Sequence, residues 1–231
     1  MVKSFQVFNL LNKMKNNSLN VWEIENSFHF YSDPSRIKKI TCHYEILKKT
    51  AKIPGHIVEC GVFKGNSLIR FLIFREQMGN NKKKCVYGFD VFGKFPKQPN
   101  IKDNNFAKKH DKEIGLGFQY NRINRILKKK KFKNFKLIKG PVENTLDAFL
   151  KKNKNLKISF LHLDLDVYKP TFYALNKLYN RVSRGGIILL DDYGQVEGAT
   201  KATNDFLKKK GLKNKITNLK FDKRLKFIEK K

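Results

Sequence analysis

Four aspartates directly follow two short apolar runs in this 231-residue chain, so acidic side chains stand where two strands are expected to end. Asp164 and Asp166 follow the run ISFLHL, and Asp191 and Asp192 follow IILL. Such runs are typical of strands buried on both faces of a parallel sheet. Carboxylates gathered together repel one another by about 4 kcal/mol per pair at about 4 Å. The four acids therefore predict a cation among them, and oxygen ligands favour magnesium, calcium or manganese.

The residues between the two acidic pairs have the pattern of a crossover helix. Pro170 stands near its predicted start, apolar residues recur from Phe172 to Val182, and Gly185 and Gly186 end it. A strand–helix–strand crossover of this kind is right-handed in nearly all proteins, so the two strands run parallel and their acidic ends share one edge. Ligands bind open α/β sheets at the carboxyl ends of the strands.

A glycine turn and a further acid precede this unit. The sequence VECGVFKGNS leads from a predicted strand into a helix, with Gly61 in the turn and Gly65 at the helix start. Glycine allows both the turn and a close approach of backbone to a ligand. The next predicted strand, residues 85–89, ends at Asp90, which is placed to accept hydrogen bonds from ribose hydroxyls. The pattern favours a nucleoside-containing ligand.

The rest of the chain is expected to form a cap and a lid around this core. Residues 1–52 contain two helical patterns, one through Phe5 and Met14 and one opened by Asp33-Pro34, and form the predicted N-terminal helical cap. Residues 53–231 form the main domain. Within it, the polar stretch 92–112 has no apolar period and is predicted to be a lid loop.

The C-terminal residues are predicted to form strands, and three histidines are expected to have structural roles. Residues 215–231 are predicted to form two strands, which add an antiparallel hairpin to a mostly parallel sheet. His29 and His43 are expected to be surface or packing histidines. His162 lies inside a predicted strand and is expected to be a hydrogen-bonded core residue.

Composition limits the classes of partner. The formal net charge of +30 is typical of proteins that bind nucleic acid, because they neutralise phosphates. However, only eight of the 50 basic residues are arginine, the side chain that clamps phosphates with a bidentate fork. We therefore expect weak, salt-sensitive RNA binding and no specific nucleic-acid partner. Three widely spaced cysteines, no bilayer-length apolar run and no cleavage site predict a cytoplasmic protein without a membrane anchor.

Six segments follow one another in the order seen in a known family. They are VECGVFKGNS, GFDVFGKFP, KGPVENTL, LHLDLDVYKPT, LYNRVSRGGIILLDDYG and GATKATNDF. Over roughly residues 53–212 the chain resembles the macrocin O-methyltransferase family, whose members methylate sugar hydroxyls with S-adenosylmethionine. The resemblance implies a seven-stranded, Rossmann-like class I methyltransferase fold. It also implies a small-molecule acceptor, a sugar or other vicinal diol such as a glycosylated metabolite, and it leaves a homo-oligomer open.

The resemblance further implies which residues form the site. A divalent cation, usually magnesium, would lie on Asp164, Asp191 and Asp192, where it would orient two neighbouring hydroxyls and lower the pKa of one of them. Family members offer a histidine after the paired aspartates as a base, and this chain has none there. His110, Asp166 and Tyr193 then remain as candidates for proton removal. The cofactor would contact Glu59, Gly61, Gly65 and Ser67 at its methionine end, Asp90 at its ribose, and Gly140 and Glu143 on the adenine side.

Two other functions stay open beside the sugar O-methyltransferase. The positive charge suggests an RNA methyltransferase, although the Asn/Asp-Pro-Pro-aromatic signature of many base N-methyltransferases does not occur. A non-catalytic binding module on the same fold is the other alternative. Such a module would be expected to lose some of the site acids, and Glu59, Asp90 and Asp164 are all present.

Overall fold

The computed structural model describes residues 20–80, 82–212 and 216–231. It divides into two compact units, Met1–Lys38 and Lys39–Lys231, rather than after residue 52 as expected. The boundary is earlier because the helix α3, Ser35–Thr50, buries Cys42 and Ile46 in the core of the second unit. The helical pattern predicted through Phe5 and Met14 lies outside the described residues.

The described part of the first unit contains one helix that the sequence reading missed. This helix, α2, spans Val21–Tyr31 and begins with a capping box. The Asn20 carboxamide accepts from the Glu23 amide at 3.0 Å, and the Glu23 carboxylate accepts from the Asn20 amide at 3.1 Å. The helix predicted at Asp33-Pro34 is confirmed as α3, where the Asp33 carboxylate accepts from the Ser35 amide at 2.8 Å.

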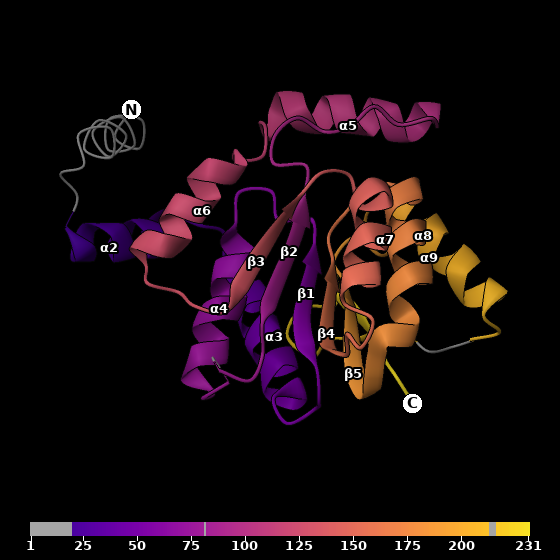
Figure 1. The fold of residues 1–231 in the computed structure, drawn as a ribbon. Coiled ribbons are helices and arrows are strands. Elements are labelled where there is room, and N and C mark those ends of the chain that lie inside the picture. The colour runs from indigo at the N-terminus through magenta and orange to yellow at the C-terminus, as the bar shows by residue number, and fades with distance from the viewer. Residues whose placement is uncertain (1–19, 81, 213–215) are drawn as a thin grey trace. The chain divides into compact units, whose positions relative to one another are not determined.

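The second unit is built on one seven-stranded sheet in the order β3-β2-β1-β4-β5-β7-β6. Strands β1 to β5 are parallel (Figure 1). Strand β7 pairs antiparallel with both β5 and β6. This arrangement confirms the predicted mostly parallel sheet with a terminal antiparallel hairpin. The strands are β1 His56–Cys60, β2 Val86–Asp90, β3 Phe135–Lys139, β4 Ile158–Leu163, β5 Val182–Leu190, β6 Ile216–Asn218 and β7 Lys226–Glu229.

Helices cover both faces of this sheet and enclose two apolar cores. Leu146, Leu175 and Phe206 pack against one face, from α7, α8 and α9. Ile46 and Phe71 pack against the other, from α3 and α4 (Figure 1). The helices of the second unit, besides α3, are α4 Asn66–Gln77, α5 Ile101–Glu113, α6 Tyr120–Lys129, α7 Val142–Lys152, α8 Tyr168–Leu178 and α9 Glu197–Lys209.

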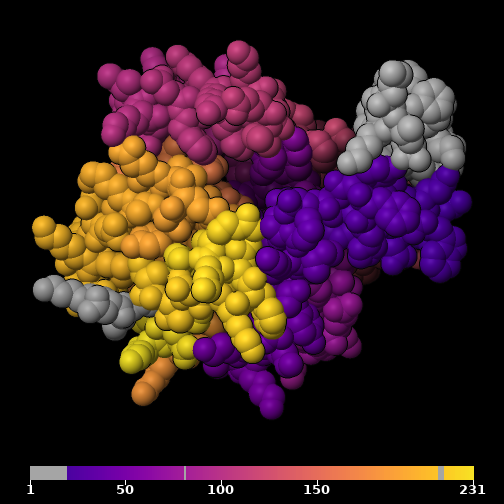
Figure 2. All heavy atoms as spheres, turned by 180° about the vertical axis from the view of Figure 1, so that it is seen from behind, coloured from indigo at the N-terminus to yellow at the C-terminus, as the bar shows by residue number. Residues whose placement is uncertain are grey.

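The C-terminal hairpin lies beside the second-unit part of α3. The Lys49 ammonium and the Glu229 carboxylate are 2.6 Å apart there. Figure 2 shows the second unit from this side, with the C-terminal strands in yellow. Lys226 of β7 pairs with Leu190 at the end of β5, directly before the acidic residues Asp191 and Asp192. Among the described helices, none is both long and apolar enough to cross a membrane.

The stretch 92–112 is not a continuous loop, which corrects the prediction made for it. Helix α5 begins after Asn100, whose side chain accepts from the Lys102 amide at 2.8 Å. The Asp103 carboxylate accepts from the Tyr168 amide at 3.0 Å and so ties α5 to the start of α8. The helix was missed because Asp103 and Ala107 are its only buried residues, so the sequence shows no apolar period. Closure of this segment over an acceptor stays a prediction.

Candidate active site

A cavity of about 330 Å³ lies at the carboxyl ends of the parallel strands, beneath α5. Its wall combines residues from the turns after β1, β2, β3 and β4 with residues from α5. Most of the predicted cofactor and acid positions therefore meet at one place. The predicted residues on the wall are Gly61, Asp90, His110, Gly140, Glu143, Asp164 and Asp166.

Glycine is required at two of these turns. Gly61 has φ +94°, and a Cβ there would lie 1.7 Å from the Asp164 carbonyl oxygen, so any side chain would separate β1 from β4. Gly140 has φ +133°, and its amide donates to the Asp90 carbonyl at 2.9 Å. The two glycines hold the ends of β1, β2 and β3 close together around the cavity.

Asp90 organises the glycine turn as well as lining the cavity. Its Oδ2 accepts from the amides of Val62 at 2.7 Å and Phe63 at 2.8 Å, and its Oδ1 accepts from the Phe92 amide at 2.5 Å. One carboxylate thus fixes the turn after β1 and the turn after β2. An additional donor from a ligand would have to use the second lone pair of Oδ1.

Three predicted cofactor residues lie behind the turn and not on the cavity wall. Glu59 is fully buried in β1, where its Oε1 is 3.0 Å from Nδ1 of His162. Gly65 starts α4 with φ +87°, and the Ile123 side chain occupies the space that its Cβ would need. Ser67 is buried in the first turn of α4. Glu59, Gly65 and Ser67 thus belong to the elements on either side of the turn after β1 and do not line the cavity.

Three of the four predicted acids form a tight cluster. One carboxylate oxygen from each of Asp164, Asp166 and Asp192 lies within 4.8 Å of the others. The Asp166 amide donates to Oδ2 of Asp192 at 2.9 Å, and Asp166 reaches this position with φ +62°. Burial and the neighbouring carboxylates raise the pKa of Asp164 and Asp192 well above its ordinary value, and raise that of Asp166 to about 7.

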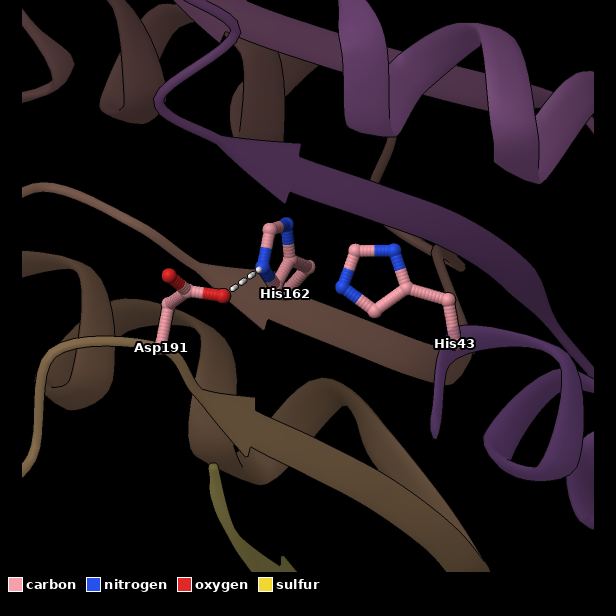
Figure 3. Close-up of side chains that lie close together, drawn as sticks. All are labelled: His43, His162 and Asp191. Carbon is pink, nitrogen blue, oxygen red and sulfur yellow. Dashed lines mark hydrogen bonds and ion pairs between the residues drawn. The ribbon is translucent and has the colours of Figure 1, made fainter. Parts of the chain in front are cut away.

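The fourth acid, Asp191, faces different partners, although it was predicted to join Asp164 and Asp192. Its Oδ2 is 2.6 Å from the Lys39 ammonium, and its Oδ1 is 3.3 Å from Nε2 of His162 (Figure 3). Burial alone would raise the pKa of Asp191, but His162 and Lys39 lower it below its ordinary value. The cation predicted among the acids is thus partly supplied by the chain itself, as Lys39.

His162 is a hydrogen-bonded core residue, as expected, but it also belongs to the site. It lies fully buried between Glu59 and Asp191. Burial alone would lower its pKa, yet the hydrogen bonds to Asp191 and Glu59 raise the pKa to about 10. Neither Lys39 nor the Glu59–His162 pair was predicted as part of the site. An acidic residue and a histidine at facing positions of neighbouring strands were the available signal.

The remaining candidate bases are placed very differently. His110 lines the cavity from α5, and its Nδ1 is buried without a hydrogen-bond partner in the described chain. Its ring lies 5.2 Å from the ring of Phe63, and burial lowers its pKa, which keeps the imidazole neutral near pH 7. The Tyr193 hydroxyl instead donates to Asn204 of α9 at 2.9 Å and is not on the cavity wall.

Comparison with known proteins identifies the family. Residues 34–225 match the model of the family described as macrocin-O-methyltransferase (TylF), and this range includes every residue of the cavity and of the acidic cluster. The chain belongs to the macrocin-O-methyltransferase family. The resemblance seen in the six sequence segments is thereby confirmed.

Two curated relatives share about a quarter of their aligned residues with the chain. One is the 8-demethyl-8-(2,3-dimethoxy-alpha-L-rhamnosyl)-tetracenomycin-C 4'-O-methyltransferase of Streptomyces olivaceus, 24% identical over 72% of this chain and 63% of the relative. The other is the demethyldecarbamoylnovobiocin O-methyltransferase of Streptomyces niveus, 25% identical over 67% of this chain and 58% of the relative. The chain therefore spans less than two thirds of the length of either relative.

Solved structures confirm the class I methyltransferase fold. The calicheamicin methyltransferase CalS11 superposes with a TM-score of 0.76 at 19% identity, covering 98% of this chain and 91% of CalS11. The O-methyltransferase NovP superposes with a TM-score of 0.72 at 20% identity, covering 84% of this chain and 80% of NovP. At these identities the likeness shows the fold, and the chemistry has to be argued from the side chains.

Proposed function

We propose that this chain is an S-adenosylmethionine-dependent O-methyltransferase that acts on a sugar hydroxyl of a small glycosylated or nucleotide-linked acceptor. The observation that carries the proposal is the family match over residues 34–225 together with a cavity that joins Gly61, Asp90 and the acids after β4. The names of relatives support the acceptor class, because one acts on a rhamnosyl compound and CalS11 is described as a TDP-rhamnose 3'-O-methyltransferase.

The cavity suits a nucleoside-containing cofactor. The turn at Gly61 brings backbone to its wall without a side chain, and Asp90 and Glu143 supply carboxylate oxygens at two points of that wall. The His110 Nδ1 lacks a partner in the described chain, as expected of a polar atom that a ligand satisfies. In this assignment Asp90 faces the ribose and Glu143 the adenine side.

The acidic cluster suits a divalent cation with hard oxygen ligands. Asp164 and Asp192 belong both to the predicted ligand set and to the observed cluster, and Asp166 completes the cluster. Their raised pKa values reflect carboxylates that repel one another in a buried place. An oxygen-only donor set favours magnesium or manganese over metals that prefer nitrogen or sulfur.

The proposed reaction is an in-line displacement that needs mainly orientation and removal of one proton. When bound, the cofactor supplies an electrophilic methyl group, and the cation supplies positive charge beside the acceptor oxygen. As the acceptor oxygen takes the methyl group, the methyl carbon–sulfur bond would break and leave a neutral thioether, and the chain must accept the hydroxyl proton. His110, with its neutral ring, is a wall residue that can accept a proton near neutral pH. Asp166, whose pKa is about 7 in the metal-free chain, is the alternative where the cation is held by Asp164 and Asp192 alone.

Calorimetric titration with S-adenosylmethionine and a methyl-transfer assay on TDP-rhamnose test the proposal. Asp90→Ala should lose about ten- to a hundredfold in cofactor affinity, because it removes a charged hydrogen-bond acceptor. Glu113→Gln, an exposed acid outside the cavity, is the matched control and should bind like the wild type. A wild-type chain that binds no cofactor, or that methylates RNA selectively at physiological salt and no glycoside, would refute the proposal.

The two candidate proton acceptors can be separated by the pH dependence of turnover. His110→Gln should remove the lower limb of the profile if the imidazole accepts the proton, and Asp166→Asn should do so if the carboxylate does. Cofactor affinity measured in the same variants serves as the control, since both side chains also line the cavity.

A further inference from the structure

Two buried histidines and Asp191 face a common point beside the acidic cluster (Figure 3). His43 comes from α3, His162 from β4, and Asp191 directly follows β5. One donor atom from each lies within 4.8 Å of the others, and both imidazoles are fully buried. The three side chains therefore converge although His43 and His162 lie 119 positions apart in the sequence.

His43 has no evident reason to be a histidine in the protein alone. Neither of its ring nitrogens has a hydrogen-bond partner in the part of the chain that the structure describes. An unpaired buried polar atom costs about 1–3 kcal/mol. Figure 3 shows one of these nitrogens pointing toward His162 and Asp191. Burial lowers the pKa of His43, so its ring is neutral and has a free lone pair.

His162 is oriented as metal-binding histidines usually are. Its Nδ1 is held by the buried Glu59 carboxylate at 3.0 Å, which leaves Nε2 directed at Asp191 Oδ1, 3.3 Å away. A carboxylate behind the imidazole fixes the ring and raises the basicity of the nitrogen that binds the metal. The Phe71 ring packs against both imidazoles, with ring centroids 5.0 Å from that of His43 and 5.2 Å from that of His162.

We propose that His43, His162 and Asp191 bind a divalent transition-metal ion, with Zn²⁺ as the best match. Two imidazole nitrogens and one carboxylate form a donor set that zinc commonly uses, whereas magnesium prefers oxygen alone. Because this site contains nitrogen donors, it prefers a different metal from the oxygen cluster of Asp164, Asp166 and Asp192. The ion takes the place of the proton between His162 and Asp191 and gives His43 a partner.

Charged neighbours set how tightly such an ion is held. Lys39 binds the other oxygen of Asp191, and both Lys39 and Arg70 act electrostatically on His43. The buried carboxylate of Glu59 and those of the adjacent oxygen cluster oppose these cations. Lys39 therefore competes with the metal for the Asp191 carboxylate and weakens binding of the metal at this site.

Calorimetry on the metal-depleted full-length chain tests the proposal. Magnesium is kept in excess to fill the oxygen cluster, and Zn²⁺ or Co²⁺ is then titrated. We expect equimolar binding, and for Co²⁺ the visible absorption of a low-coordinate nitrogen–oxygen site. His43→Phe, which keeps a ring against Phe71, should weaken binding by more than about tenfold, as should Glu59→Gln through loss of the support behind His162.

Matched variants separate loss of the site from loss of the fold. His29→Gln removes an exposed histidine of α2 and should bind zinc like the wild type, and Lys39→Met should bind it more tightly. Zinc should raise the melting temperature of the wild type but not of His43→Phe. Wild-type zinc affinity in His43→Phe, or no zinc binding by the wild type in excess magnesium, would overturn the proposal.

Discussion

Asp191 and Asp192 are adjacent in the sequence, yet their surroundings are electrostatically opposite. Asp191 lies between the Lys39 ammonium and His162, and its pKa is lowered. Asp192 is buried beside Asp166 and Asp191, and its pKa is raised well above the ordinary value. The pKa values of two successive carboxylates in one turn therefore shift in opposite directions, because different side chains pack against them.

Because their neighbours differ, Asp191 and Asp192 are expected to have different roles. The charge of Asp191 is already balanced by side chains of the same protein, so in the metal-free chain it contributes to stability. Asp192, with Asp164 and Asp166, has carboxylates as neighbours that outweigh the distant effect of Lys39. A cation from solution therefore has its most favourable electrostatic interactions at that cluster.

Asp191→Asn should cause the largest loss of stability. It removes the carboxylate that the Lys39 ammonium contacts and one of the two carboxylates that contact the His162 imidazolium, Glu59 being the other. Breaking a buried pair costs about 3–5 kcal/mol. Urea denaturation of the metal-free protein measures the free energy of unfolding. A loss below about 1 kcal/mol, the range of exposed pairs, would show that the pair is not buried in solution.

Asp192→Asn should have the opposite sign in the same experiment. The amide keeps an oxygen that can accept from the Asp166 amide, and it removes one carboxylate from a self-repelling cluster. We expect the metal-free variant to be more stable than the wild type by about 1–2 kcal/mol. Equal destabilisation by both substitutions would show that the electrostatic surroundings of the two acids do not differ.

The pH dependence of stability should reveal His162. Its folded pKa of about 10 exceeds the ordinary value of 6.5, so the folded chain retains a proton that the unfolded chain releases. This contribution is complete below pH 6.5 and is lost as the pH rises toward 10, with a slope of up to about 1.4 kcal/mol per pH unit. Denaturation at several pH values should show this slope in the wild type and a flatter curve in His162→Gln.

Tyr193→Phe should have the smallest effect. The hydroxyl makes one partly exposed hydrogen bond to Asn204 and is not on the cavity wall, so its removal should cost about 1 kcal/mol or less of stability. Turnover should stay within about fivefold of the wild type, which corresponds to a change in activation free energy below about 1 kcal/mol. A much larger loss of turnover would return Tyr193 to the list of candidate bases.

The parts of the fold with strong local signals could be predicted from the sequence. The run ISFLHL, the crossover helix at Pro170 and the run IILL have the periods of a strand–helix–strand unit, and the structure has that unit as β4, α8 and β5. Gly185 and Gly186, which were expected to end the helix, lie inside β5 instead, because α8 already ends at Leu178. Helix α5 could not be recognised by period, because it buries only Asp103 and Ala107. Helix α2 could have been found from its Asn20–Glu23 capping box.

The site was predictable to the level of the sheet edge but not to the level of individual oxygen atoms. That Asp164, Asp166, Asp191 and Asp192 share an edge follows from parallel strands. Which of them point together depends on backbone angles such as φ +62° at Asp166 and on helix packing that brings in Lys39 and His43. Nothing in the sequence of α3 marks those two residues among its neighbours.

Methyl transfer measured with and without a chelator tests the central claim most directly. We expect that EDTA abolishes turnover, that magnesium restores it, and that S-adenosylmethionine still binds throughout. Asp192→Asn should lower turnover by about a hundredfold or more in magnesium, while its cofactor affinity stays close to that of the wild type. Full methyl transfer in the presence of chelator would contradict the account and leave an enzyme that works by proton removal alone.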